Sequence, residues 1–348
     1  MFGFGSRVVK ELSESEKRGV ESLIRSCGLS FEDGADCTAI VENSDGGLAA
    51  TASLFGRVIR MVAVLDEYQD AGLSAVAISS LLEVARVGGE SHLFVFTKPD
   101  AAGRFASLGF RNIAETEDVS LLEIGEPGIS SYRKYLAGFR ALAEPEGEKR
   151  GAVVVNCNPF TLGHRSLIER ALERCETLCV IVVEAELSVF SFDDRFAMVL
   201  AGTEDLRGHA SPKRVAVLGS GDYAVSAATF PTYFLKERAP LAVAERQARL
   251  DLELFLRLFA PSLGVSVRFI GTEPLSPLTN VYNRVMREVL PPGGVEVNEL
   301  ERAVTERGDV ISATVVREKL SSGDTDDIRD YLPDSTIKYL RTKLSYGI

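Results

Sequence analysis

Two apolar runs near the middle of the chain constrain its fold more than any other feature. The runs are Gly151-Ala-Val-Val-Val-Asn156 and Leu178-Cys-Val-Ile-Val-Val183, and neither alternates with polar residues. Strands that are apolar on both faces are typical of a parallel sheet covered by helices. Further strands are expected at residues 214–218 and 266–270, with helices between them that include residues 164–175 and 193–201. This alternation predicts an α/β domain that binds ligands at the carboxyl ends of its strands.

The first part of the chain has a different pattern. Helices are expected at residues 11–27 and 72–87, and short strands at 37–41, 48–54, 58–64, 92–97 and 119–123. This mixture predicts an α+β domain over residues 1–128. A segment rich in charge, Pro and Gly at residues 143–151 marks a boundary. We therefore expect a connecting helix and linker over residues 129–150 and a second domain over residues 151–348.

Charge and cysteine content narrow the class of protein. With 39 Lys and Arg against 50 Asp and Glu, the net charge is −11, and no basic tract offers a surface for nucleic acid or an anionic membrane. No apolar run has the length of a signal peptide or membrane span, which predicts a cytoplasmic protein. The five cysteines lack the spacing of metal ligands, so we predict that they are structural and that there is no protein-bound metal site.

The first apolar run leads into the segment Cys157-Asn-Pro-Phe-Thr-Leu-Gly-His164. Pro159 ends the strand, and Gly163 allows the backbone to approach a ligand closely. Thr161 and His164 then lie at a helix N-terminus, where backbone N–H groups favour phosphate. An imidazole at this position can donate to an α-phosphate as negative charge builds up. The alternative is that His164 only caps or packs the helix.

Two motifs resemble the nucleotidylyltransferase superfamily. Thr161-Leu-Gly-His164 is similar to its T/H-x-G-H motif, and Ile311-Ser-Ala-Thr-Val-Val-Arg317 is similar to its I-S-x-T-x-x-R segment. The resemblance implies a Rossmann-like parallel-sheet domain of the HIGH type, in which Arg317 and hydroxyl groups hold the β- and γ-phosphates of ATP. An ordinary capped helix is the alternative for the second motif.

Further segments resemble the citrate lyase ligase family. They lie at residues 189–198, 219–233 and 269–274, with Tyr282-Asn-Arg284. Membership implies an AMP-forming acid–thiol ligase that uses ATP, Mg²⁺ and acetate. Its partner is the acyl carrier subunit of citrate lyase, whose dephospho-CoA-like arm carries the thiol to be acetylated.

The resemblance, with the position of each residue near a strand end, gives a predicted site. The predicted catalytic residues are His164, Thr161 and Arg317. The predicted ATP-binding residues are Asn156, Asn158, Pro159, Phe160, Gly163, Arg195, Gly219, Ser220, Asp222, Gly271, Glu273, Ser312 and Thr314. Alternatives remain a surface ion pair for Arg195, a plain turn for residues 219–222, and an orienting contact to Arg284 for Glu273. No residue can be assigned to the carboxylate of the acid.

The N-terminal domain resembles the GCN5-related N-acetyltransferases, abbreviated GNAT. Gln69, Gly72 and Ser74 match the three positions of their Q/R-x-x-G-x-G/A pyrophosphate loop, and Phe105-Ala-Ser-Leu-Gly-Phe110 matches a later stretch. The resemblance implies a GNAT-like fold and a cradle for a CoA-type group, although Ser74 adds a side chain to the loop. The alternative is a helix-starting turn.

Two other functions remain open at this stage. One is a nucleotidylyltransferase that adenylylates a phosphorylated cofactor precursor and so keeps AMP in its product. The other is an acetyl-CoA-dependent N-acetyltransferase with a nucleotide-sensing domain.

Overall fold

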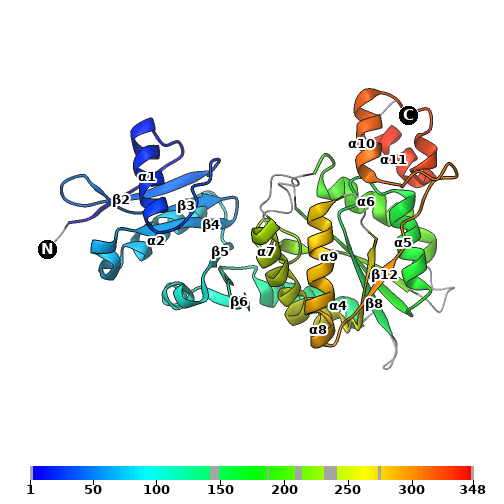
Figure 1. The fold of residues 1–348 in the computed structure, drawn as a ribbon, viewed down its shortest axis with the longest axis horizontal. Coiled ribbons are helices and arrows are strands. Elements are labelled where there is room, and N and C mark those ends of the chain that lie inside the picture. The colour runs from blue at the N-terminus through cyan, green and yellow to red at the C-terminus, as the bar shows by residue number, and fades with distance from the viewer. Residues whose placement is uncertain are drawn as a thin grey trace. The chain divides into compact units, whose positions relative to one another are not determined.

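The computed structural model shows two compact units, residues 1–131 and residues 132–348. The structure describes residues 3–141, 149–185, 188–207, 214–230, 241–272 and 276–345. Figure 1 shows that both units combine helices and strands, and each is described by itself. Every helix in the described part of the chain is too short or too polar to cross a lipid bilayer.

The first unit is built on a mixed seven-stranded sheet in the order β1-β2-β3-β4-β5-β7-β6. Neighbouring strands are antiparallel except β4 and β5, which are parallel. The strands are β1 (Gly5–Val9), β2 (Cys37–Glu42), β3 (Leu48–Phe55), β4 (Val58–Val64), β5 (Leu93–Thr97), β6 (Arg111–Glu115) and β7 (Ser120–Ile124). The predicted α+β character is confirmed. The sequence predicts neither β1 nor β6, because these edge strands carry few apolar residues.

Helices α1 (Glu14–Ser26) and α2 (Leu73–Val87) accompany this sheet, with the short α3 (Ala102–Ala106). Helix α1 begins at a capping box in which the Ser13 hydroxyl accepts the N–H of Glu16. Helix α2 packs one apolar face against the sheet, as the 3.6-residue period requires. The buried residues of that face are Leu73, Ala77, Ile78, Leu81 and Ala85.

The turn between β4 and α2 is the segment that resembles the pyrophosphate loop. It is a 3-10 turn over Asp66–Ala71, followed by Gly72 at a φ of 72°, a conformation that favours glycine. Within the turn, the Gln69 amide donates to a carboxylate oxygen of Asp66 at 2.8 Å. The strand–turn–helix order agrees with the prediction, and binding of a CoA-type group stays a prediction.

The second unit contains a five-stranded sheet in which every pair of neighbours is parallel. Its order is β10-β9-β8-β11-β12. The strands are β8 (Arg150–Val155), β9 (Thr177–Val182), β10 (Arg214–Gly219), β11 (Val267–Gly271) and β12 (Glu296–Leu300). The predicted α/β class is confirmed. Strand order reverses between β8 and β11, so their carboxyl ends flank the crevice where such sheets bind ligands.

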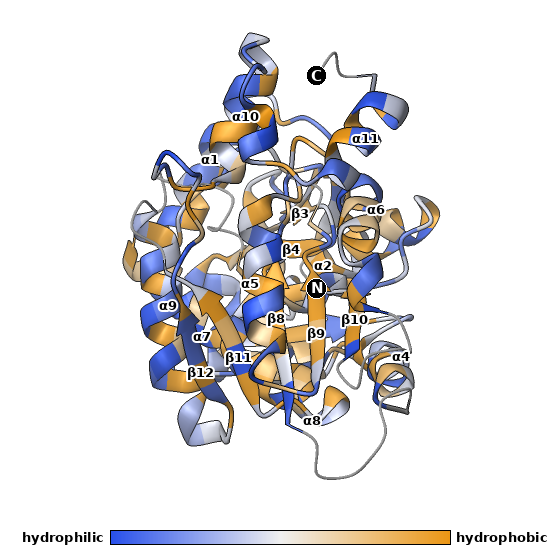
Figure 2. Ribbon diagram, turned by 90° about the vertical axis from the view of Figure 1, so that its right-hand side faces the viewer, coloured by the Kyte–Doolittle hydropathy of each residue, from blue (hydrophilic) through white to orange (hydrophobic). Residues whose placement is uncertain are grey.

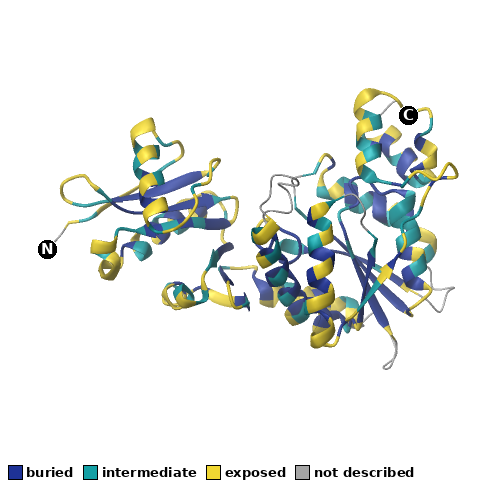
Figure 3. Ribbon diagram, in the orientation of Figure 1, coloured by how far each residue is buried: buried dark blue, intermediate teal, exposed yellow. Residues whose placement is uncertain are grey.

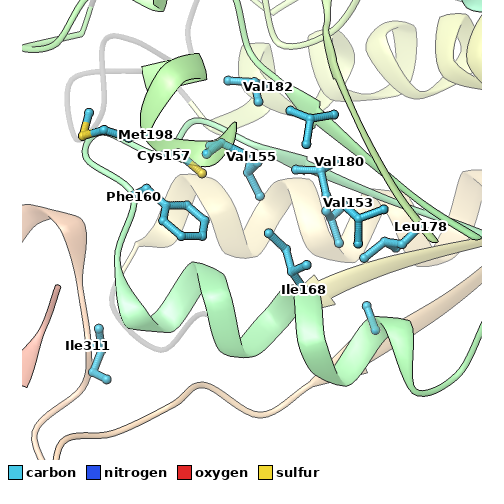
Figure 4. Close-up of a cluster of buried hydrophobic side chains, with 14 of the residues drawn as sticks. Val153, Val155, Cys157, Phe160, Ile168, Leu178, Val180, Val182, Met198 and Ile311 are labelled. Carbon is cyan, nitrogen blue, oxygen red and sulfur yellow. The ribbon is translucent and has the colours of Figure 1, made fainter. Parts of the chain in front are cut away.

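Helices cover both faces of the parallel sheet (Figure 1). The helices of this unit are α4 (Ile129–Ala141, which begins at the end of the first unit), α5 (Leu162–Leu172), α6 (Phe192–Gly202), α7 (Leu241–Leu254), α8 (Ala260–Leu263), α9 (Pro277–Val289), α10 (Ala313–Ser322) and α11 (Asp334–Lys343). Strands β8, β9, β10 and β11 are mainly apolar (Figure 2) and buried (Figure 3), whereas β12 is more polar and more exposed. Figure 4 shows Ile168 of α5 directed at Val153 and Val180 of the sheet, within one core cluster.

The C-terminal helices pack over the start of α5. The N–H of Leu162 donates to the carbonyl of Tyr331 at 2.8 Å. The hydroxyl of Thr336, on α11, donates to the carbonyl of Phe160 at 3.0 Å. The C-terminal segment therefore lies against the start of α5 although the two are far apart in the sequence.

Candidate active site

Thr161 and His164 form a reciprocal hydrogen-bonded pair at the start of α5. The Thr161 hydroxyl accepts the N–H of His164 at 3.3 Å and lies 2.9 Å from His164 Nδ1. The N–H of Thr161 donates to the same Nδ1 at 3.1 Å. This is a capping box in which an imidazole stands where Glu or Gln is usual. His164 therefore does cap the helix, and this cap also fixes the orientation of its ring.

The capping box determines which nitrogen of His164 carries the proton. A backbone N–H can only donate, so Nδ1 accepts and the neutral ring carries its proton on Nε2. Burial and the positive charges of Arg302 and Arg317 lower the imidazole pKa from 6.5 to about 4. At neutral pH, His164 is therefore an uncharged side chain that donates through Nε2–H.

The segment that resembles the second motif lies against the first. A Cβ on Gly163 would be 3.1 Å from the carbonyl oxygen of Ile311, so the close approach that this glycine permits is to Ile311. Figure 4 shows Ile311 beside the start of α5. The guanidinium of Arg317 donates to the carbonyl of Asn158 at 2.6 Å, across 159 positions of sequence. The structure thus brings together the Thr161–His164 pair and Arg317.

Ser312 and Thr314 both take part in the beginning of α10. Ser312 is the N-cap, and its hydroxyl accepts the N–H of Thr314 at 3.2 Å. The exposed Thr314 hydroxyl accepts from Arg317 at 2.9 Å. The capped helix that stood as the alternative is present. Phosphate binding by these two hydroxyl groups stays a prediction.

Pro159 and Phe160 are buried behind the site. The Phe160 ring stacks on the His164 imidazole, with centroids 6.0 Å apart and planes at 19°. On its other side it fills the space that a side chain at Gly202 would need. The ring therefore supports the imidazole from within the core, which is a different role from direct ATP binding.

Arg195 occupies a place different from the predicted one. It is fully buried and donates to the carbonyl groups of Asn156, Val183, Ala185 and Phe190 at distances of 2.6 to 3.1 Å. A further bond of 2.9 Å reaches Asn156 Oδ1. This corrects the prediction, because a guanidinium held by carbonyl groups inside the protein is neither a surface ion pair nor a phosphate ligand. Arg195 ties the ends of β8 and β9 together.

The glycine-rich loop after β10 accommodates a protein carboxylate. A side chain at Gly219 would collide with Glu184, whose carboxylate accepts the N–H of Gly221 at 2.9 Å. The Ser220 hydroxyl accepts the N–H of Glu184 at 3.0 Å. The hydroxyl of Tyr132, on α4, donates to the carbonyl of Gly219 at 2.6 Å. The loop is thus internally paired, and its contact with ATP stays a prediction.

The remaining predicted ligands are Asp222, Gly271 and Glu273. Asp222 accepts a bond of 2.7 Å from the Ser226 hydroxyl through its carbonyl, as in a turn. Gly271 ends β11, next to the crevice at β8. Glu273 lies outside the described residues. Contact of Asp222, Gly271 and Glu273 with ATP stays a prediction.

Sequence reasoning missed Arg302. The residue follows β12, and its N–H donates to the Thr272 hydroxyl at the end of β11, 3.1 Å away. Its charge acts on His164, as the lowered imidazole pKa shows. The only available signal was its place just after a strand, but β12 alternates in polarity and was itself not predicted.

The parallel sheet, its strand order and the Thr161–His164 helix start define an α/β protein of the nucleotidylyltransferase-like class. Among the described residues, no three His, Cys, Asp or Glu side chains are grouped as a metal ion would need. A family model described as the citrate lyase ligase C-terminal domain matches residues 150–340. The chain belongs to the citrate lyase ligase family.

Individual relatives match nearly the whole chain. The [citrate [pro-3S]-lyase] ligase of Klebsiella pneumoniae is 36% identical over 339 residues, which is 95% of each chain. The protein of the same name from Escherichia coli is 31% identical, and the match covers 99% of this chain and 96% of that protein.

A solved structure matches a smaller part of the chain. An acyl-CoA N-acyltransferase from Pseudomonas aeruginosa aligns over its full length with 35% of this chain, at 16% identity and a TM-score of 0.32.

Proposed function

We propose that this protein activates acetate with MgATP and transfers the acetyl group to citrate lyase. In the first step, a carboxylate oxygen of acetate attacks the α-phosphorus and the bond to the β-phosphate breaks, which gives acetyl-adenylate and pyrophosphate. In the second step, the thiol of the carrier arm attacks the acetyl carbon, the carbon–oxygen bond to AMP breaks, and the thiol proton is released. The relatives named above support citrate lyase as the partner.

One observation carries the proposal for the first step. His164 is held as an uncharged Nε2–H donor at the N-terminus of α5, and Arg317 is fixed beside it. A neutral donor stabilises charge that develops on the α-phosphate in the transition state. Arg317 provides a permanent cation for the departing pyrophosphate. No protein nucleophile is required, because positioning and electrostatics lower the barrier.

Mg²⁺ is expected to reach the site with ATP, bound by phosphate oxygens and water. When bound, it neutralises part of the triphosphate charge. The described side chains around His164 are donors and cations, which suits them to the phosphates of that complex.

The decisive measurement is ATP–pyrophosphate exchange across a series of small carboxylic acids. We expect exchange that depends on acetate in the wild-type protein. His164→Ala should lower it by about 100- to 1,000-fold, the usual effect of losing one such donor. His209→Ala makes the same chemical change elsewhere in the chain and serves as the control.

Product analysis separates the remaining alternatives. Free AMP with an acetylated carrier supports the ligase. AMP retained in a dinucleotide product would indicate the nucleotidylyltransferase, and acetyl transfer from acetyl-CoA without ATP would indicate the acetyltransferase. Acetate-dependent exchange that survives the loss of His164 would refute the assignment of the site.

A further inference from the structure

The side-chain amide of Asn156 has a fixed orientation. Its Oδ1 accepts from the Arg195 guanidinium at 2.9 Å and from the Ser188 hydroxyl at 3.2 Å. A guanidinium can only donate, so the atom that faces it must be the amide oxygen. The buried Arg195 is itself held by surrounding carbonyl groups, so a ligand cannot turn it away.

This arrangement leaves the Nδ2 amino group of Asn156 as a pair of unused donors. In the described part of the chain, no protein group accepts from Nδ2. The residue is only half-buried and directly follows β8, the central strand. The amino group therefore belongs to the carboxyl edge of the sheet at the point where strand order reverses, which is where a ligand binds.

Asn158, two residues further on, has a similar amide but different neighbours. Its Oδ1 accepts the N–H of Phe190 at 3.2 Å, and its carbonyl accepts from Arg317. The side chain of Asn158 is thus bonded to the segment between β9 and α6, while its backbone carbonyl is bonded to Arg317. Asn156 is bonded to Arg195 of α6 and to Ser188, and it has no hydrogen bond to Arg317 in the described part of the chain.

In the proposed reaction, the attacking and leaving oxygens lie on opposite sides of the α-phosphorus. Arg317, which is bonded to the Asn158 carbonyl, is assigned to the departing pyrophosphate. The acid is then assigned to Asn156, whose hydrogen bonds go to Arg195 and Ser188 and not to Arg317. A neutral amide also holds a carboxylate more weakly than a guanidinium would, so less of the nucleophile's reactivity is lost in the ground state.

We propose that the Nδ2 amino group of Asn156 binds the carboxylate of the acid substrate and directs one of its oxygens at the α-phosphate. The inference rests on the proposed function and assigns the acid-binding group that the sequence left open. It moves Asn156 from the nucleotide to the acid. Arg195 and Ser188 are then positioning residues that act through the amide oxygen.

Asn156→Asp is the sharpest test, because it changes only the ligand-facing atom. The retained Oδ1 still accepts from Arg195 and Ser188, while the amino group becomes a carboxylate oxygen that repels the acid. We expect the KM for acetate in ATP–pyrophosphate exchange to rise by about 10- to 100-fold. The Kd of MgATP, measured by calorimetry without acid, should rise by less than the KM for acetate, because Mg²⁺ neutralises part of the triphosphate charge.

Asn158→Asp is the matched comparison, since it makes the same change at the asparagine whose backbone carbonyl is bonded to Arg317. It should weaken MgATP binding more than it raises the KM for acetate. Thermal unfolding of both variants verifies the fold, and Asn156→Ala replaces Asn156→Asp if the charged variant is unstable.

Two results would overturn the inference. One is an unchanged acetate KM in a folded Asn156→Asp protein, and the other is an equal loss of MgATP and acetate binding, which would make Asn156 a nucleotide contact. Either can occur while the wild-type protein shows acetate-dependent exchange. Absence of that exchange in the wild type would instead count against the proposed function itself.

Discussion

At the scale of single residues, the site depends on an uncharged histidine. Thr161 donates its N–H to Nδ1 of His164, and Arg302 and Arg317 oppose protonation of the ring. A charged imidazole would attract ATP in the ground state as strongly as in the transition state. A neutral donor contributes mainly when charge develops, which favours turnover over tight substrate binding.

The lowered pKa of His164 gives a prediction for acid pH. Because the pKa is about 4, the ring stays neutral as pH falls through 6.5, and kcat/KM for exchange should show no ionisation of this histidine above about pH 5. Nitrogen-15 NMR of the imidazoles checks this directly, with His164→Gln to identify the signal. We expect an Nε2–H tautomer that protonates near pH 4, and a midpoint near 6.5 would contradict the described geometry.

The burial of Arg195 gives a second prediction at this scale. Arg195→Lys keeps the charge but cannot reach all the oxygens that now accept from the guanidinium. We expect the free energy of unfolding to fall by about 2–4 kcal/mol in urea titration. Arg207→Lys is the control, because Arg207 is exposed and should change stability by less than about 0.5 kcal/mol.

The sequence predicted part of this detail and could not predict the rest. Thr161, His164 and Arg317 lie in motifs whose order and residue types indicate phosphate chemistry. The burial of Arg195, the orientation of the Asn156 amide and the charge of Arg302 near the imidazole all depend on tertiary neighbours. Such neighbours leave no local pattern in the sequence.

At the scale of elements, the start of α5 and the segment before α10 fit together through Gly163. A methyl group at this position would press on the carbonyl of Ile311, 3.1 Å away. Gly163→Ala should therefore separate the two motifs, lower the free energy of unfolding by about 1–3 kcal/mol and reduce exchange activity. Denaturant titration and the exchange assay provide the measurements.

Gly138→Ala is a matched control for that change. Gly138 also lies in a helix, α4, and an added Cβ there has open space around it. The substitution should raise stability by about 0.5–1 kcal/mol through the better helix propensity of alanine. Equal effects of the two substitutions would show that the contact with Ile311 is unimportant.

Strands that are buried on both faces could be predicted from the sequence, whereas strands with an exposed face could not. Strands β8, β9, β10 and β11 are mainly apolar, so they could be predicted as strands. Strands β1, β6 and β12 are edge strands with one face in solvent, and their mixed polarity resembles that of loops. The sheet orders themselves come from pairing between distant segments and are not encoded locally.

At the scale of the whole molecule, the second compact unit begins before the segment that matches the family model. That model starts at residue 150, whereas the unit starts at Tyr132 in α4. The Tyr132 hydroxyl donates to Gly219, and its ring lies 4.9 Å from Tyr223 and 5.8 Å from Phe259. Helix α4 therefore completes the core that supports the parallel sheet.

This packing predicts different behaviour for two fragments. Residues 129–348 should unfold cooperatively and keep acetate-dependent exchange. Residues 150–348 lack α4 and expose Tyr223 and Phe259, so we expect a lower Tm and binding of a hydrophobic dye. Differential scanning calorimetry of both fragments measures their Tm values. Equal Tm values would mean that α4 does not contribute to the thermal stability of this unit.

Cys157 lies between Asn156 and Asn158, and its state bears on whether the enzyme is modified by its own reaction intermediate. An acyl-adenylate acylates thiols, so an enzyme that makes one is exposed to modification by its own intermediate. The Cys157 thiol is fully buried, and burial raises its pKa, which keeps it protonated. The residue is held at a φ of 52°, an uncommon value for a side chain other than glycine, within the loop that carries Asn156. In the proposed reaction, this loop would keep its thiol protonated and unreactive next to the acetyl-adenylate, so that the acetyl group reaches the carrier.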